Sequence, residues 1–100
     1  MRVGNEPLGW KLVRFTEVVD KWITRESPSD DMRVVVLDWI MSRHEDPYRG
    51  MRREPAVPNL WFGAVAGSQS GWTVVTCSYF IYERTKIISC NDICTLNQPI

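Results

Sequence analysis

Residues 72–82, WTVVTCSYFIY, constrain the fold of this chain more than any other stretch. The run is dense in β-branched and aromatic residues and contains no Gly, Pro or charged residue, which is typical of a central β-strand. A second β-rich segment, residues 87–93, follows a charged turn centred on residues 84–85. We therefore predict a β-hairpin at the centre of a sheet.

A two-residue turn at residues 84–85 sets the register of this hairpin. One slipped residue would exchange the two faces, so the register is a hypothesis. The side predicted to face the core is mostly apolar. The opposite side, with Phe80 and Tyr82, mixes polar and apolar residues and could face solvent or form a functional site. The predicted core-facing pairs are Ile81 with Ile88, Tyr79 with Cys90, and Cys77 with Asp92.

The length and charge of the chain limit the functions to consider. Its 100 residues predict one domain over residues 1–100, with residues 1–8 as a flexible start. Twelve Lys and Arg balance twelve Asp and Glu, so no whole-molecule field draws the protein to nucleic acid or to an anionic membrane. No apolar run approaches the roughly 20 residues that span a bilayer, and the start lacks a signal-peptide core. We expect a cytoplasmic protein without membrane contact.

Metal and cofactor patterns are absent from the sequence. Three cysteines, Cys77, Cys90 and Cys94, occur without CxxC spacing, and the chain has a single histidine. The glycine-containing residues 67–71 lead into a strand rather than a helix, so they do not form a phosphate loop. We expect reduced thiols and neither metal nor cofactor.

Two helical patterns follow a short first strand at residues 9–15. Thr16 is predicted to cap a helix that runs to about residue 25. Ser27 precedes Pro28 at a first helical position, which predicts a second helix to about residue 45. Its apolar stripe is wide enough to predict contacts on two sides, with the sheet and with the first helix. The stripe consists of Met32, Val35, Val36, Trp39 and Ile40, widened by Val34, Leu37 and Met41.

The rest of the chain predicts loops and strands. Residues 46–58, DPYRGMRREPAVP, are rich in proline and are expected to form a loop. Residues 59–66 predict another strand, and the tail after residue 93 is expected to cover a sheet edge. The predicted fold is α+β: an N-terminal strand, a two-helix hairpin, then a three-stranded antiparallel meander.

This order of elements resembles the RelE/ParE superfamily of bacterial toxins over roughly residues 10–93. The matching features are a Trp-bearing first helix, HEDP at residues 44–47, the arginine-rich passage to NLW at residues 59–61, and the strand pair around residues 79–91. The resemblance implies a growth-inhibiting toxin, either a ribosome-dependent mRNA endonuclease or an inhibitor of DNA gyrase. It also implies an antitoxin that wraps an extended segment around the toxin.

A ribonuclease of this kind needs a base, cations for the phosphate and an acid for the leaving oxygen. The arginines would supply charge, Tyr82 would stack on a base or donate a proton, and His44 would titrate near neutral pH. The candidate catalytic residues are Arg52, Arg53, Arg84, Tyr82 and His44, and the candidates for RNA or partner binding are Arg49, Lys86, Trp61 and Trp72.

A second hypothesis is a non-catalytic binding module that inhibits a bacterial protein target. This hypothesis rests on the neutral net charge of the chain, because RelE-like nucleases are usually strongly basic. Each candidate residue also has a structural interpretation. The arginines could lie in a solvated loop with some ion pairs. His44 could be a cation at a helix C-terminus, and Tyr82 could be a packing residue with a solvent-exposed hydroxyl. The sequence does not distinguish these alternatives, nor does it predict the oligomeric state.

Overall fold

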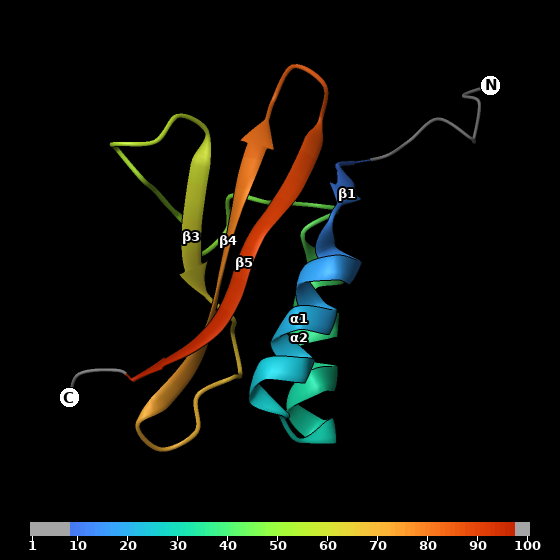
Figure 1. Cartoon of the computed structure of the whole chain (residues 1–100). Helices are drawn as coiled ribbons and strands as arrows, with labels where there is room; N and C mark the ends of the chain where they lie inside the picture. Colours follow the sequence, from blue (N-terminus) through green and yellow to red (C-terminus); the bar gives the residue numbers. More distant parts are fainter. Residues whose placement is uncertain (1–8, 98–100) are drawn as a thin grey trace.

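The computed structural model describes residues 9–97 as a five-stranded sheet with two helices on one of its faces (Figure 1). The elements are β1 (Lys11–Val13), α1 (Phe15–Glu26), α2 (Asp30–Ser42), β2 (Arg52–Arg53), β3 (Leu60–Ala64), β4 (Thr73–Tyr82) and β5 (Ile87–Asn97). The spatial order of the strands is β1-β5-β4-β3-β2. β1 runs parallel to β5, and all other neighbours are antiparallel. The predicted flexible start at residues 1–8 lies outside the described residues.

The predicted fold of a strand, a helical hairpin and a three-stranded antiparallel meander is wrong. The sheet has five strands and is mixed, because β1 joins its edge beside β5 and β2 joins the opposite edge beside β3. β2 lies within residues 46–58, which the prolines predict to be a loop. It is only two residues long, too short to produce an alternating pattern. The pairing of β1 with β5 joins segments that are distant in sequence.

The helix boundaries differ from the predicted ones at the turn between the helices. Ser27 closes α1 in a left-handed conformation, with φ of 47° and its N–H bonded to the carbonyl of Ile23. Ser29 rather than Ser27 therefore caps α2, and its Oγ accepts the N–H of Met32 across 3.1 Å. Thr16 lies inside α1, whose N-cap is Arg14. α2 ends at Ser42, three residues before the predicted end.

The β4–β5 hairpin confirms two of the three predicted core pairs. Ile81 pairs with Ile88 and Tyr79 with Cys90, but Cys77 pairs with Ile93 rather than Asp92. A β-bulge at Ser78 and Tyr79 shifts the register by one residue. The shift places Ile93 in the core, fully buried, and leaves Asp92 exposed. β5 continues to Asn97, so residues 94–97 of the segment predicted as an edge-covering tail are strand, and residues 98–100 lie outside the described part of the chain.

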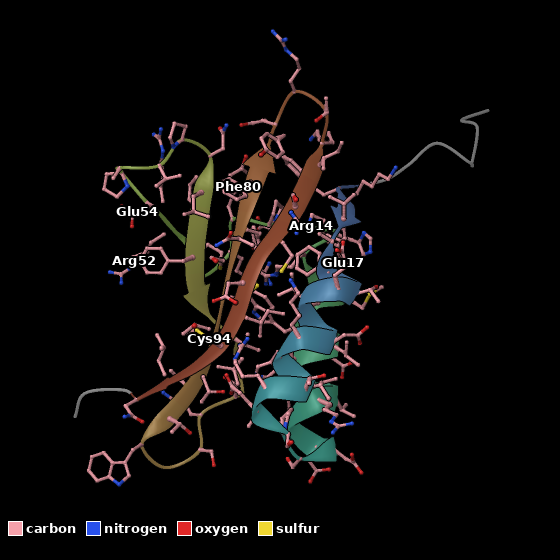
Figure 2. All side chains as sticks on the ribbon, in the orientation of Figure 1. Arg14, Glu17, Arg52, Glu54, Phe80 and Cys94 are labelled. Carbon is pink, nitrogen blue, oxygen red and sulfur yellow. The ribbon has the colours of Figure 1, made fainter. Side chains whose placement is uncertain are left out.

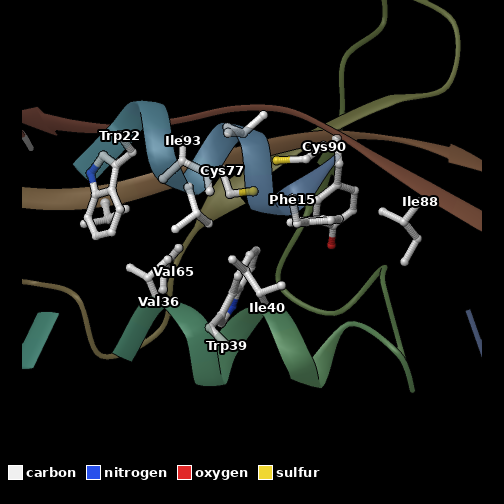
Figure 3. Packing of buried hydrophobic residues seen from close by; sticks show 14 of the residues in the cluster. Phe15, Trp22, Val36, Trp39, Ile40, Val65, Cys77, Ile88, Cys90 and Ile93 are labelled. Atoms are coloured by element: carbon white, nitrogen blue, oxygen red, sulfur yellow. The ribbon is translucent and has the colours of Figure 1, made fainter. Parts of the chain in front are cut away.

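The core lies between the two helices and the sheet face beneath them. Figure 3 shows Trp22, Val36 and Trp39 from the helices meeting side chains of the sheet such as Cys77 and Ile93. Trp39, a member of the predicted apolar stripe, is buried, and so is Trp22. Burial of aromatic and aliphatic side chains of this size contributes roughly 1.5–3 kcal/mol each.

The three residues predicted to widen the buried stripe of α2 are exposed instead. Val34, Leu37 and Met41 are 56%, 46% and 59% exposed. The reason is that α1 and α2 form a single layer, so only one side of the α2 stripe meets the core (Figure 1).

Within the described residues, neither helix is long and apolar enough to cross a membrane.

Candidate functional site

The sheet face opposite the helices carries no covering element within residues 9–97 (Figure 2). Successive strand side chains point to opposite faces. Because Cys77 and Tyr79 point into the core, Ser78 and Phe80 point to the uncovered side. We call this side the open face. Its side chains include Arg52, Leu60, Phe62, Ala64, Thr76, Ser78, Phe80, Tyr82, Ile87, Ser89, Asp92, Cys94 and Leu96.

One row of side chains on the open face, which we call the polar row, crosses four strands. Arg52 pairs with Phe62, Phe62 with Ser78, and Ser78 with Asp92. The four residues line a shallow pocket of about 360 Å³. The Arg52 guanidinium lies over the Phe62 ring, 5.3 Å from its centroid, and Nδ2 of Asn91 donates to the Ser78 hydroxyl across 2.9 Å. The row therefore places a cation at one end, a carboxylate at the other, and an aromatic ring and a hydroxyl between them.

Aromatic rings continue from this row toward the tip of the hairpin. The rings of Phe80 and Tyr82 are nearly parallel, with an interplanar angle of 13° and centroids 6.2 Å apart. Tyr82 is 42% exposed, and Phe80 and Phe62 are half-buried. Exposed aromatic faces on a sheet are surfaces on which unpaired nucleobases stack. The open face thus combines stacking surfaces with a cation and hydrogen-bonding groups.

Only two of the five predicted catalytic residues lie on the open face. Arg52 belongs to the polar row, and Tyr82 lies four residues beyond Ser78 along β4, a separation of ~13 Å along the strand. Arg53 pairs with Trp61 on the alternate side of β2. Arg84 is exposed in the turn between β4 and β5. These residues do not converge on one phosphate.

His44 lies on the helical side of the molecule. Its Nδ1 donates to the carbonyl oxygen of Trp10 across 2.8 Å, just before β1. The backbone N–H of Trp10 in turn donates to the carbonyl of His44. His44 therefore ties the end of α2 to the start of β1, and it cannot act on a ligand at the open face.

The residues predicted to bind RNA or a partner are also dispersed. Arg49 is exposed beside Asp46, with 3.9 Å between the charged groups. Lys86 lies over the ring of Trp10, and Trp61 is half-buried, edge-on to Tyr48. Trp72 is exposed in the turn before β4. The structure therefore brings none of these four to the polar row of the open face.

The neutral net charge conceals a separation of charge between the layers. Residues 15–42, the two helices and their turn, contain six acidic and three basic residues, a net charge of −3. The other described residues, 9–14 and 43–97, contain five acidic and eight basic residues, a net charge of +3. The sheet and its loops are therefore the cationic part of the molecule, which the composition of the whole chain does not reveal.

The structure also shows a buried network that the sequence did not indicate. Arg43 is buried and donates to the carbonyl of Arg49 across 2.8 Å and to the Tyr79 hydroxyl across 3.4 Å. The Tyr79 hydroxyl donates to the carbonyl of Pro47. Burial raises the pKa of Tyr79 to about 12, although Arg43 opposes the shift. The network holds the loop that leads from α2 into β2 and so positions Arg52.

Metal ligands do not gather in the part of the chain that the structure describes: no group of three or more His, Cys, Asp or Glu side chains comes together there. No family model matches this chain, and a search of the curated proteins found no match.

Proposed function

We propose that this protein is a bacterial growth inhibitor that binds single-stranded RNA on the open face of its sheet. The observation that carries the RNA-binding part is the combination of Arg52 over the Phe62 ring with the parallel rings of Phe80 and Tyr82 on an uncovered sheet. Growth inhibition is proposed only from the sequence resemblance to the toxins named above, and the geometry of the open face does not bear on it. An mRNA target would require a cytoplasmic protein, as the sequence predicts.

Stacking on the aromatic rings and attraction to the positive charges would both contribute to RNA binding. Base–aromatic stacking contributes about 1–3 kcal/mol per base and tolerates any sequence. The Ser78 hydroxyl and the Asp92 carboxylate lie in the same row as Phe62, within reach of base edges. The net charge of +3 outside the two helices and their turn favours binding of a polyanion away from the acidic helices, and Arg52 supplies a cation on the open face.

The proposal is for binding, and it does not include the predicted catalytic set. Cleavage needs a base, an acid and cations around a single phosphate. His44, Arg53 and Arg84 lie away from the polar row that contains Arg52. An inhibitor of this kind would act by occupying RNA, with mRNA on the ribosome as the first target to test.

Fluorescence anisotropy with labelled single-stranded oligouridine tests the binding directly. Tyr82→Ser should weaken binding by about tenfold because it removes a stacking surface. Arg52→Gln should weaken binding and reduce the dependence of log K on log salt by about 0.7 for each phosphate that the arginine neutralises. Leu37→Ser, an equally exposed apolar residue on α2, is the matched control and should bind like the wild type. Equal RNA affinity of all four proteins would refute the proposed site.

Induced expression in a bacterium tests the biological role. We expect growth arrest with intact mRNA ends, abolished in the Tyr82→Ser variant and retained in the Arg53→Ala, Arg84→Ala and His44→Ala variants. New cleavages inside translated codons would show that the protein is a nuclease. Continued growth would argue against an inhibitor in that host.

A bacterial protein target bound by the open face is a second candidate. It is favoured by the electrical neutrality of the pocket, in which Arg52 and Asp92 are the charged lining residues, and by the exposed Leu96 at its end. This candidate predicts growth arrest that depends on Tyr82 although the purified protein binds no RNA. Such a result would be compatible with the inhibition of DNA gyrase that the resemblance implies.

A further inference from the structure

A groove runs along the outer side of the helical layer, between α1 and α2. It has a volume of about 750 Å³. Residues of β1, α1 and α2 supply its apolar lining, which consists mainly of Leu12, Val19, Ile23, Leu37, Ile40 and Met41. Val19 and Ile40 also belong to the buried core, so the groove lies over the helical side of the core and away from the open face.

The α2 wall of the groove is unusually exposed. Leu37 and Met41, four residues apart on one helical face, are 46% and 59% exposed, and Val34 one turn earlier is 56% exposed. Side chains at this spacing form a continuous stripe. A stripe of this kind at a groove is the arrangement that accepts the apolar face of another helix.

The charges around the groove select the kind of helix. Glu17 and Asp20 line the α1 side, and the two helices with their turn have a net charge of −3. Arg14 also lines the groove and lies 3.8 Å from Glu17, so Arg14, Glu17 and Asp20 together carry a net charge of −1. His44 donates to the carbonyl oxygen of Trp10. The groove therefore presents an apolar floor beside an acidic wall.

We propose that this groove binds an amphipathic α-helix of a partner protein, with aliphatic side chains on one face and Lys or Arg beside them. The aliphatic residues would pack on Leu37 and Met41, and the cations would meet Glu17 and Asp20. A second copy of this chain fits less well, because its helical layer would bring the same negative charge to the interface. The proposal does not depend on RNA binding, because the groove and the open face lie on opposite sides of the sheet.

A synthetic amphipathic helix of Leu and Lys, labelled for anisotropy, tests the groove in the full-length protein. The comparison peptide has the same Leu positions with Glu in place of every Lys. We expect the Lys peptide to bind about tenfold or more tightly than the Glu peptide. Glu17→Gln with Asp20→Asn should remove this preference, whereas Asp92→Asn on the open face should keep it.

The apolar contacts are tested with Leu37→Ser combined with Met41→Ser. This variant should lose binding of the Lys peptide, whereas Val57→Ser, an exposed aliphatic residue in the loop before β3, should retain it. Both changes are at exposed positions, and thermal unfolding by circular dichroism checks that the fold is kept. Chemical-shift changes in the amide spectrum should map to α1 and α2, and RNA affinity should not change.

Four outcomes would overturn the proposal. Equal affinity for the two peptides would remove the role of charge, and unchanged binding in the double serine variant would place the peptide elsewhere. A dimer in light scattering that the double serine variant does not form would identify a second copy as the occupant. Nuclear Overhauser contacts from residues 1–8 to Leu37 and Met41 methyl groups would identify the chain's own start as the occupant.

Discussion

The carboxylate of Glu26, the last residue of α1, accepts the backbone N–H of Thr95 in β5 across 3.1 Å. Beside it, Arg25 donates to the carbonyl of Ile93 across 2.7 Å. β1 pairs only with residues 87–89 of β5, so the edge of β5 beyond them needs other partners for its backbone groups. The end of α1 thus continues the protection of this edge where the short edge strand stops.

We expect Glu26→Ala to lower the free energy of unfolding by about 1–3 kcal/mol, because it leaves the Thr95 N–H without its acceptor. The same carboxylate also accepts the indole N–H of Trp22. Urea unfolding monitored by tryptophan fluorescence measures the change. Glu17→Ala removes an exposed carboxylate from the same helix and should change stability by less than about 0.5 kcal/mol. Equal effects of the two substitutions would contradict the edge role.

The same carboxylate should make stability depend on pH. Its burial raises the pKa, but the hydrogen bonds from Thr95 and from Arg25 lower it by more, so the pKa of Glu26 lies below its ordinary value of 4.5. Its contribution is therefore present above the pKa of the unfolded chain and is lost as pH falls through the lower folded pKa. Between about pH 5 and 3 the wild type should lose more stability than Glu26→Gln. Parallel urea midpoints of the two proteins over this range would rule out the linkage.

Tyr79 should be one source of alkaline sensitivity. Burial raises its pKa from 10.0 to about 12. Because the folded state holds the proton more tightly, this contribution to stability is present below pH 10 and is lost as pH rises toward 12. Absorbance titration at the phenolate band should show a late phase that Tyr79→Phe removes. That substitution should also cost about 1–2 kcal/mol, since Arg43 and the carbonyl of Pro47 each lose a partner. A titration unchanged by Tyr79→Phe would show that another group gives the late phase.

Gly63 should be a position where even a methyl group disturbs the sheet edge. A Cβ at Gly63 would lie 2.5 Å from the carbonyl oxygen of Gly50 and 2.7 Å from Sδ of Met51. Gly63→Ala should therefore destabilise the protein by about 1–3 kcal/mol and displace the segment that leads into β2, weakening RNA binding through Arg52. Gly50→Ala is the control, because its Cβ would meet no atom within 4 Å, although its positive φ adds about 1 kcal/mol of strain. Native stability in Gly63→Ala would contradict the close approach.

The two serines at the turn between the helices should respond in opposite directions. Ser29→Ala removes the N-cap of α2 and should cost about 1 kcal/mol. Ser27→Gly relieves a left-handed backbone at φ of 47° and should be neutral or stabilise by up to about 1 kcal/mol. Thermal unfolding of the two variants compares them. A larger destabilisation by Ser27→Gly than by Ser29→Ala would restore the cap predicted from sequence.

The candidate site is only partly predictable from the sequence. Alternation along a strongly patterned strand assigns Phe80 and Tyr82 to the mixed face of the hairpin, and the structure places them on the open face. The same alternation assigns Asp92 to the core, because no sequence pattern marks the bulge that turns it outward. Charge alone makes Arg52 a candidate, but its position over Phe62 depends on a two-residue strand.

The sequence by itself determined the segments with a strong local pattern: two amphipathic helices, the run of residues 72–82 and the turn that follows it. Local periodicity decides which side of such a segment is apolar. Only the tertiary structure decided that β1 and β2 complete the sheet, that α2 leaves Leu37 and Met41 exposed, and that His44 and Arg52 lie on opposite sides. Most of these features depend on contacts between residues far apart in the chain, and β2 is too short to show a pattern. A local pattern records the burial that a segment favours, not the partner that provides it.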